Sequence, residues 1–131
     1  MLTLSLLPET LAICRLERDA LIPSWAQASS FFSMTRTENE LSIVCPQECV
    51  PEGTRCNTDW KCFRIEGPIE FSAVGVLASF VEPLAKANVS VFVICTFETD
   101  YLMVKKKDVG RAARGLSSAG HRIRELVITT P

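Results

Sequence analysis

The sequence lacks long apolar runs, an excess of positive charge and all but one histidine. Apolar runs such as residues 91–95 are far shorter than the ~20 residues of a membrane-spanning helix. Lysine and arginine number 14 against 15 acidic residues, so a basic nucleic-acid-binding face is not expected. Hydrophobic residues make up 47% of the 131 positions, enough for a globular core. We therefore expect a globular protein whose partners include neither a membrane nor a nucleic acid.

The common motifs of phosphate, metal and nucleophile chemistry are also missing. There is no glycine-rich phosphate loop, no nucleophile elbow and no carboxylate–histidine metal motif. The one histidine, His121, follows Gly120 at the start of an expected strand, where a solvated side chain is more common than a catalytic base. The basic run 105–107 is interpreted as a solvated strand edge. We predict no enzymatic activity, no catalytic residue and no cofactor.

Six cysteines raise the question of disulfides or a metal. The apolar residues 1–7 have no cationic leader, so they are interpreted as a strand and not as an export signal. Free thiols in the cytoplasm are therefore favoured over a disulfide framework. Three cysteines lie in apolar runs and are expected to be buried: Cys14, Cys45 and Cys95. Four cysteines cluster within eighteen residues, but their spacing does not form the paired knuckles of a zinc site, so no metal is predicted: Cys45, Cys49, Cys56 and Cys62.

The C-terminal half has a clear alternation of strand and helix patterns. Ser72 is placed to cap the first helix, Pro83 is expected to kink or break it, and Asn88 to end it in the left-handed conformation. Asp108 is expected to cap the second helix, and Gly120 to stop it. The pattern predicts an α+β fold of order βαββαβ, with strands at 60–66, 91–96, 101–105 and 122–128 and helices at 72–87 and 108–119.

The N-terminal half resembles a shortened copy of the same unit. Shifted by 60 residues, positions 31–44 lie over positions 91–104, with matching hydrophobic and turn-acid positions. The first helix of this copy must be short, at about residues 23–28, and residues 46–59 are expected to be mostly loop. The alternative is a chance similarity between two amphipathic hairpins. We expect two domains, residues 1–59 and residues 60–131.

Two segments are candidates for ligand binding. In residues 67–80 a strand gives way to a turn and a helix start, which leaves amides around Ser72 to Gly75 available for a carboxylate. The alternative is a simple capping role for Ser72 and a packing role for Gly75. In residues 96–101, Asp100 is placed to hold an ammonium group, or to bind the amides of its own turn.

These segments lie in a stretch that resembles a known family. Residues 67–104 have the sequence GPIEFSAVGVLASFVEPLAKANVSVFVICTFETDYLMV. This stretch is similar to the ACT domain of the aspartate-kinase-like, cytosolic-arginine-sensor group, in which the same strand, loop and helix precede a hairpin of the pattern "isTf-tDy-lV". The resemblance extends plausibly over residues 60–128. It implies the ferredoxin-like ACT fold, here as a tandem pair with a shortened N-terminal unit.

The resemblance implies a regulatory protein that binds a small molecule, most naturally an amino acid, and that forms a homodimer. The implied ligand-binding residues come from the loop and the hairpin: Glu70, Phe71, Ser72, Ala73, Val74, Gly75, Val76, Thr96, Phe97 and Asp100. Ala73 carries no charge where some relatives place an acid, which argues against a cationic ligand such as arginine. Kinase relatives owe their chemistry to a separate catalytic domain. The alternative function is an interaction module that acts by self-assembly or partner binding, with a vestigial pocket.

Overall fold

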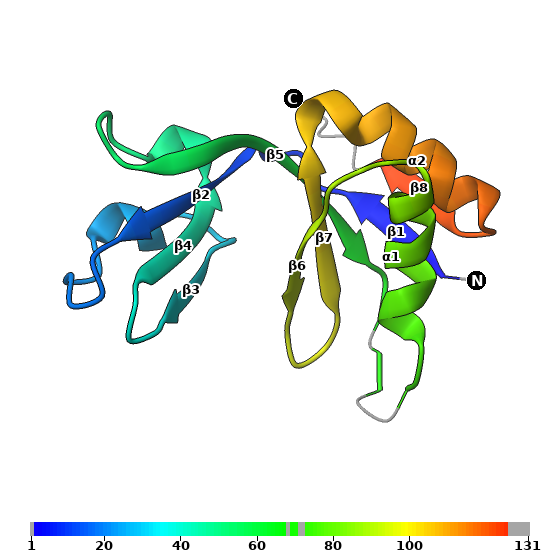
Figure 1. Ribbon diagram of the computed structural model, residues 1–131, viewed down its shortest axis with the longest axis horizontal. Helices are drawn as coiled ribbons and strands as arrows, with labels where there is room; N and C mark the ends of the chain where they lie inside the picture. The colour runs from blue at the N-terminus through cyan, green and yellow to red at the C-terminus, as the bar shows by residue number, and fades with distance from the viewer. Residues whose placement is uncertain (1, 68, 71–72, 126–131) are drawn as a thin grey trace, which may run out of the picture. The chain divides into compact units, whose positions relative to one another are not determined.

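The chain folds into two compact units in a computed structural model that describes residues 2–67, 69–70 and 73–125 (Figure 1). The N-terminal unit consists of residues 9–60, and the C-terminal unit of residues 1–8 together with 61–131. The sequence predicted a boundary between residues 59 and 60, with residues 1–8 in the N-terminal part. The structure instead groups these first residues with the C-terminal unit. Among the described residues, no helix has the length and apolar character needed to cross a membrane.

The N-terminal unit is a small antiparallel sheet with two short 3-10 helices. Strand β2 pairs with β4 and with the start of β5, and β3 pairs with β4. The elements are β2 (Leu11–Leu16), η1 (Ser24–Gln27), β3 (Ser33–Arg36), β4 (Leu41–Pro46), η2 (Gln47–Cys49) and β5 (Cys56–Ile65). The core is made of small and aliphatic side chains that include Ala12, Cys14, Ala26, Leu41, Ile43 and Cys45. The predicted short helix near residues 23–28 is confirmed as η1.

The C-terminal unit is a five-stranded sheet of order β8-β1-β5-β7-β6. Its remaining elements are β1 (Thr3–Leu6), α1 (Val76–Lys86), β6 (Phe92–Cys95), β7 (Asp100–Lys105), η3 (Lys106–Asp108), α2 (Val109–Ser118) and β8 (Arg122–Glu125). From β5 onward this is the predicted βαββαβ order. Strand β1 lies between the first and last strands of that unit, antiparallel to β5 and parallel to β8. It belongs there because Leu4 is fully buried in the C-terminal core.

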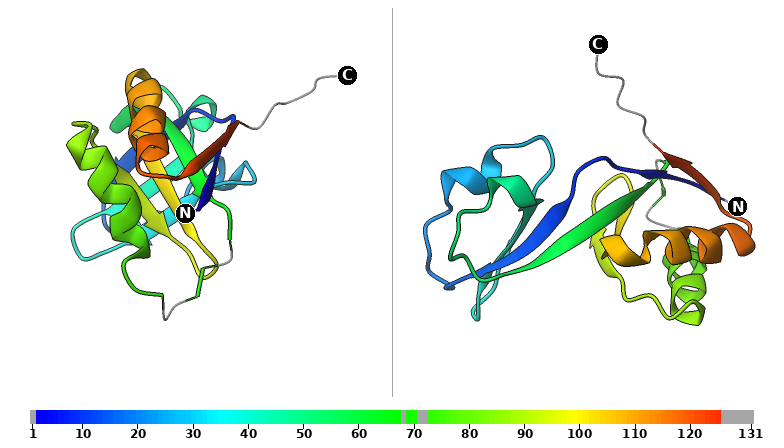
Figure 2. Two further views of the ribbon diagram at one scale, coloured as in Figure 1. Left: turned by 90° about the vertical axis from the view of Figure 1, so that its right-hand side faces the viewer. Right: turned by 90° about the horizontal axis from the view of Figure 1, so that it is seen from above.

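Both helices cover the same face of this sheet (Figure 2). Between helices and strands lies the core of the unit, which includes Leu4, Phe63, Ile65, Phe80, Leu84, Leu102, Val104, Ala112 and Leu116. The helices approach closely at Gly115, where a Cβ atom would lie 3.3 Å from the carbonyl oxygen of Pro83. Burial of this apolar surface is the main stabilising term of the unit.

Some predicted element boundaries are wrong. Helix α1 begins at Val76 and not at Ser72, because Gly75 has a φ of 77° and interrupts the helical path. The helix is not broken at Pro83, and Asn88 ends it with a φ of 59°, as predicted. Asp108 occupies the N-cap position of α2, but its carboxylate pairs with Arg111 at 2.9 Å and caps no amide.

The two hairpins have the same type of connection, at an offset that differs from the predicted one. The connections at residues 37–40 and 96–99 have the same length and begin with Thr37 and Thr96. In each connection the threonine amide donates to the carbonyl of the residue three positions later. The structural offset between the hairpins is therefore 59 residues and not the predicted 60. Strand β5 begins at Cys56, so the expectation of loop up to residue 59 is also wrong.

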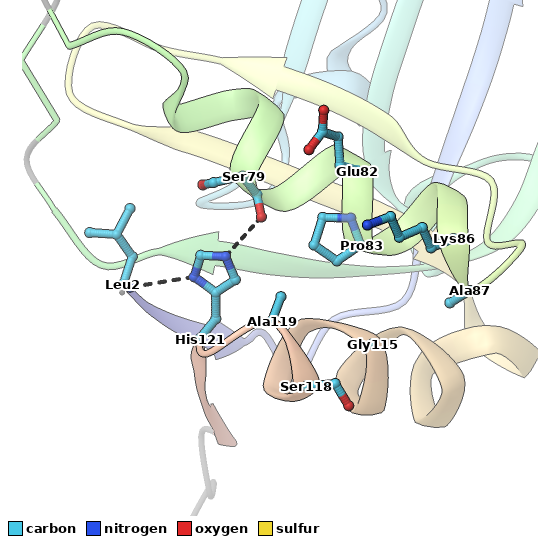
Figure 3. Close-up of a pocket in the computed structure, with 10 residues that line it drawn as sticks. All are labelled: Leu2, Ser79, Glu82, Pro83, Lys86, Ala87, Gly115, Ser118, Ala119 and His121. Atoms are coloured by element: carbon cyan, nitrogen blue, oxygen red, sulfur yellow. Dashed lines mark hydrogen bonds between the residues drawn. The ribbon is translucent and has the colours of Figure 1, made fainter.

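His121 is buried, with 8% of its surface exposed, which contradicts the expected solvated side chain. Its Nε2 lies 2.8 Å from the carbonyl oxygen of Ser79 in α1, and its Nδ1 lies 3.4 Å from the amide nitrogen of Leu2 (Figure 3). The Leu2 amide can only donate and the Ser79 carbonyl can only accept. The two contacts fit an imidazole that donates from Nε2 to Ser79 and accepts at Nδ1 from Leu2. The ring also packs on Phe80, with the ring centroids 4.6 Å apart.

Pro83 explains why the Ser79 carbonyl needs a partner outside its helix. In an α-helix this carbonyl accepts from the amide four residues later, which is position 83, and proline has no amide hydrogen. The N–H group of His121 replaces the missing donor. The helix thus continues through Pro83, and the carbonyl that the proline leaves without a donor is bonded by the residue that precedes β8.

Replacing His121 by alanine should lower the free energy of unfolding by about 1–3 kcal/mol, because the Ser79 carbonyl loses its donor. In a Pro83→Ala background the same replacement should lower the free energy of unfolding by a smaller amount, because the amide of residue 83 then donates to the Ser79 carbonyl. The lost packing on Phe80 is common to both backgrounds and cancels in the double-mutant cycle. Urea unfolding of the four proteins measures the coupling, and equal costs in the two backgrounds would contradict it.

Candidate ligand-binding site

A pocket of about 450 Å³ lies between the loop before α1 and the β6–β7 hairpin. It is lined by both apolar and polar groups from the loop, from the first turn of the helix and from the hairpin. The lining residues are Ile69, Glu70, Ala73, Gly75, Val76, Leu77, Ala78, Cys95, Thr96, Phe97, Thr99 and Asp100. We call this the loop–hairpin pocket.

Backbone hydrogen bonds hold the loop against the hairpin. The Ile69 amide donates to the carbonyl of Glu98 at 2.7 Å, and the hydroxyl of Thr99 donates to the carbonyl of Ile65 at 2.8 Å. Gly67 permits this close approach, since a Cβ there would lie 3.1 Å from the Ile69 nitrogen. The two walls of the pocket are therefore tied together at the point where β5 ends.

The connection between β6 and β7 is held by hydrogen bonds of its own. The Thr96 amide and hydroxyl both donate to the carbonyl of Thr99, at 2.8 and 3.0 Å. The Thr99 amide in turn donates to the Thr96 hydroxyl at 3.3 Å. Two threonines of the predicted segment thus have a structural role, and they fix the position at which Asp100 begins β7.

The start of α1 supplies amide donors to the pocket. The amides of Val76, Leu77 and Ala78 lie in the first helical turn, where no intrahelical acceptor exists, and Gly75 at the N-cap has no side chain to bond them. The first intrahelical bond runs from the Ser79 amide to the Gly75 carbonyl. These donors, together with the helix dipole, favour a carboxylate at this end of the pocket. They lie a few residues later than the amides that the sequence predicted.

Two acids give the pocket its charge. Glu70 and Asp100 both line it, and the described lining residues include no lysine or arginine. Asp100 is opposite Cys95 in the hairpin register. Partial burial, followed by the carboxylate of Asp100, raises the pKa of Cys95. Cys95 is nevertheless exposed, so the prediction that it is a buried thiol is wrong, whereas Cys14 and Cys45 are buried as predicted.

Seven of the ten predicted residues line the pocket: Glu70, Ala73, Gly75, Val76, Thr96, Phe97 and Asp100. Val74 is not among the lining residues and is 95% exposed. Phe71 and Ser72 lie outside the described residues. The prediction missed Ile69, Leu77, Ala78, Cys95 and Thr99, which are neighbours in sequence of the residues it named. All five lie within or directly beside the two segments that the sequence indicated, residues 67–80 and 96–101.

Comparison with known proteins identifies the fold and its family. The profile of the ACT domain family matches residues 55–118, and a second profile, described as an N-terminal domain, matches residues 9–53. The crystal structure of an Agobacterium tumefaciens protein is 35% identical, with a TM-score of 0.92, and the match covers 99% of this chain and 97% of that one. Residues 55–118 of the chain are an ACT domain.

Two further relatives indicate where such domains occur. The human cytosolic arginine sensor for mTORC1 subunit 1 is 32% identical over 89 residues, which cover 62% of this chain and 27% of that protein. The regulatory subunit of aspartate kinase from Thermus thermophilus shares the fold, with a TM-score of 0.63 at 11% identity, covering 89% of this chain and 97% of that one. The chain spans between 27% and 62% of the curated relatives it matches.

Gly75→Ala should destabilise the protein by about 1–2 kcal/mol, because an L-residue disfavours the left-handed conformation seen there. Space is not the cause, since no atom lies within 4 Å of a Cβ at this position. Gly75→Asn should cost less, as asparagine tolerates this conformation better. Chemical unfolding of the three proteins tests the order, and equal stability of the alanine and glycine forms would contradict it.

Proposed function

We propose that this chain is a regulatory ACT protein without catalytic activity that binds an amino acid in the loop–hairpin pocket. The observation that best supports this is that hydrogen-bond donors for an anion and a carboxylate for a cation line the same cavity. Amides at the start of α1 form one end, and the carboxylate of Asp100 lies on the hairpin. An α-amino acid carries a carboxylate and an ammonium group that match these two ends.

Each part of the ligand has a partner in this proposal. The ligand carboxylate accepts from the amides of Val76 and Leu77, and its ammonium group pairs with Asp100. The ligand side chain extends along Ile69 and Phe97, with Glu70 nearby. Because both acids line the pocket, neutral and basic amino acids should bind better than aspartate or glutamate. The name of the human relative, an arginine sensor, supports an amino-acid ligand.

The proposal extends to the assembly and the location of the protein. We propose a homodimer in which a second copy covers the exposed apolar side chains at the pocket, Val74 and Phe97, which are 95% and 79% exposed. The N-terminal unit then acts as a shortened companion of the complete ACT unit. A cytoplasmic location fits the cytosolic relative and the free thiols.

Asp100→Asn should abolish the stabilisation of the protein by its amino acid, because the neutral amide cannot pair with the ammonium group. In the wild type, a ligand at a hundred times its Kd adds ~2.7 kcal/mol of stability, which is easily seen in a thermal melt. A panel of the twenty amino acids identifies the ligand.

The matched control is Glu98→Gln, which removes an exposed acid of the same hairpin that does not line the pocket. It should keep the full ligand response. Equal loss of response in both variants would point to general electrostatics and contradict the assigned role of Asp100. A wild-type protein that responds to no amino acid would contradict the proposed function.

The exposed Phe97 and Val74 also favour a second candidate, an interaction module that acts by assembly alone. In that case light scattering should report a dimer whose mass is unchanged by any amino acid, and Phe97→Asp should shift it to the monomer. A dimer that retains a ligand-dependent melting shift would exclude assembly as the sole function.

A further inference from the structure

Three cysteines that are far apart in sequence meet in the N-terminal unit. Cys14 lies on β2, Cys45 on β4 and Cys56 at the start of β5. Cys14 and Cys56 are directly opposite each other in the β2–β5 register. Cys45 and Cys56 lie close enough to the thiol of Cys14 that both contribute to raising its pKa. This cluster has no part in the loop–hairpin pocket, which belongs to the C-terminal unit.

The register places Cys14 and Cys56 at a position suited to a disulfide. The Arg15 amide donates to the carbonyl of Arg55 at 2.9 Å, so the adjacent pair Arg15–Arg55 is the hydrogen-bonded pair of the ladder. Hydrogen-bonded and non-hydrogen-bonded pairs alternate along antiparallel strands, so Cys14 and Cys56 form a non-hydrogen-bonded pair. Such pairs have Cα atoms about 4.5 Å apart, at the short end of the range that disulfides span.

The exposure of the two thiols differs sharply. Cys56 is exposed, whereas Cys14 is 1% exposed. Burial, with the neighbouring cysteines as a smaller cause, raises the pKa of Cys14 to about 12. A solvent oxidant therefore reaches Cys56 first, and the protected Cys14 is the nearest partner for the oxidised sulfur.

A metal site is less well supported by the same cluster. Across residues 2–67, 69–70 and 73–125, no group of three or more histidine, cysteine or acidic side chains is arranged to hold a metal ion. Cys14 and Cys56 are instead directly opposite each other on neighbouring strands, which is an arrangement suited to a disulfide bond.

We propose that Cys14 and Cys56 form an oxidisable dithiol that a hydroperoxide converts into a cross-strand disulfide. The Cys56 sulfur first attacks the peroxide O–O bond, takes one oxygen to become a sulfenic acid, and releases water when the peroxide is hydrogen peroxide. The Cys14 sulfur then attacks the sulfenic sulfur, and the S–OH bond breaks. The departing hydroxide takes the thiol proton of Cys14 as water. Two thiols and one peroxide thus give one disulfide and two waters.

The disulfide would join β2 covalently to the start of β5. Short cross-strand disulfides are strained and more easily reduced than ordinary structural ones. The pair is therefore suited to reversible modification, and dithiothreitol should restore both thiols.

The test exposes the reduced, folded protein to hydrogen peroxide, blocks the remaining thiols with N-ethylmaleimide and maps peptides by mass spectrometry without reduction. The wild type should lose two free thiols and yield a peptide that links Cys14 to Cys56. Cys56→Ser, at an exposed position, should yield no linked peptide. The control Cys49→Ser, which alters the neighbouring thiol of the same unit, should still yield it.

Four results would overturn the proposal. They are a link to Cys45 or Cys49 instead of Cys14, a link between two chains, oxidation of Cys56 that ends at the sulfinic acid, and no consumption of either thiol. Circular dichroism of the variants before oxidation shows that they are folded, so that a missing link reports the chemistry of the pair.

Discussion

Pro83 leaves the Ser79 carbonyl of α1 without its helical donor, and His121 supplies that donor from the residue before β8. The same imidazole accepts from the amide of Leu2, next to β1. One side chain thus joins a helix, the inserted strand and the last strand of the C-terminal unit. Ser79 directly follows Val76, Leu77 and Ala78, the residues of α1 that line the loop–hairpin pocket. A buried, fully bonded histidine at this point holds both the fold and the geometry of the site.

Most of the fold of the C-terminal unit could be predicted from the sequence, because hydrophobic periodicity and turn residues report local structure. The helix end at Asn88 and the β6–β7 hairpin are examples, and in the N-terminal unit the short helix η1 is another. The insertion of β1 between β5 and β8 could not be predicted, since residues 3–6 carry no local signal of the strands they will pair with. The role of His121 was missed for a similar reason. It depends on a carbonyl 42 residues away that Pro83 leaves without a donor.

Most of the residues named from the sequence lie around one pocket, and their role in ligand binding stays a prediction. Asp100, Thr96 and the residues flanking α1 line one pocket because the hairpin and the loop are tied by the Ile69–Glu98 and Thr99–Ile65 hydrogen bonds. The exact amides were misplaced, because the left-handed conformation of Gly75 delays the start of the helix. The cysteine cluster was missed as well. Spacing along the chain excludes a zinc knuckle, but only the strand register shows that Cys14 is opposite Cys56.

The central claim is that an amino acid binds between α1 and the β6–β7 hairpin. The most direct measurement is a titration of the isotopically labelled protein with amino acids, followed by NMR of its backbone amides. The claim predicts saturable shifts concentrated at Ile69, Val76 to Ala78 and Thr96 to Asp100. An unchanged spectrum, or shifts confined to the groove between the helices near Lys86 and Ser118, would contradict it.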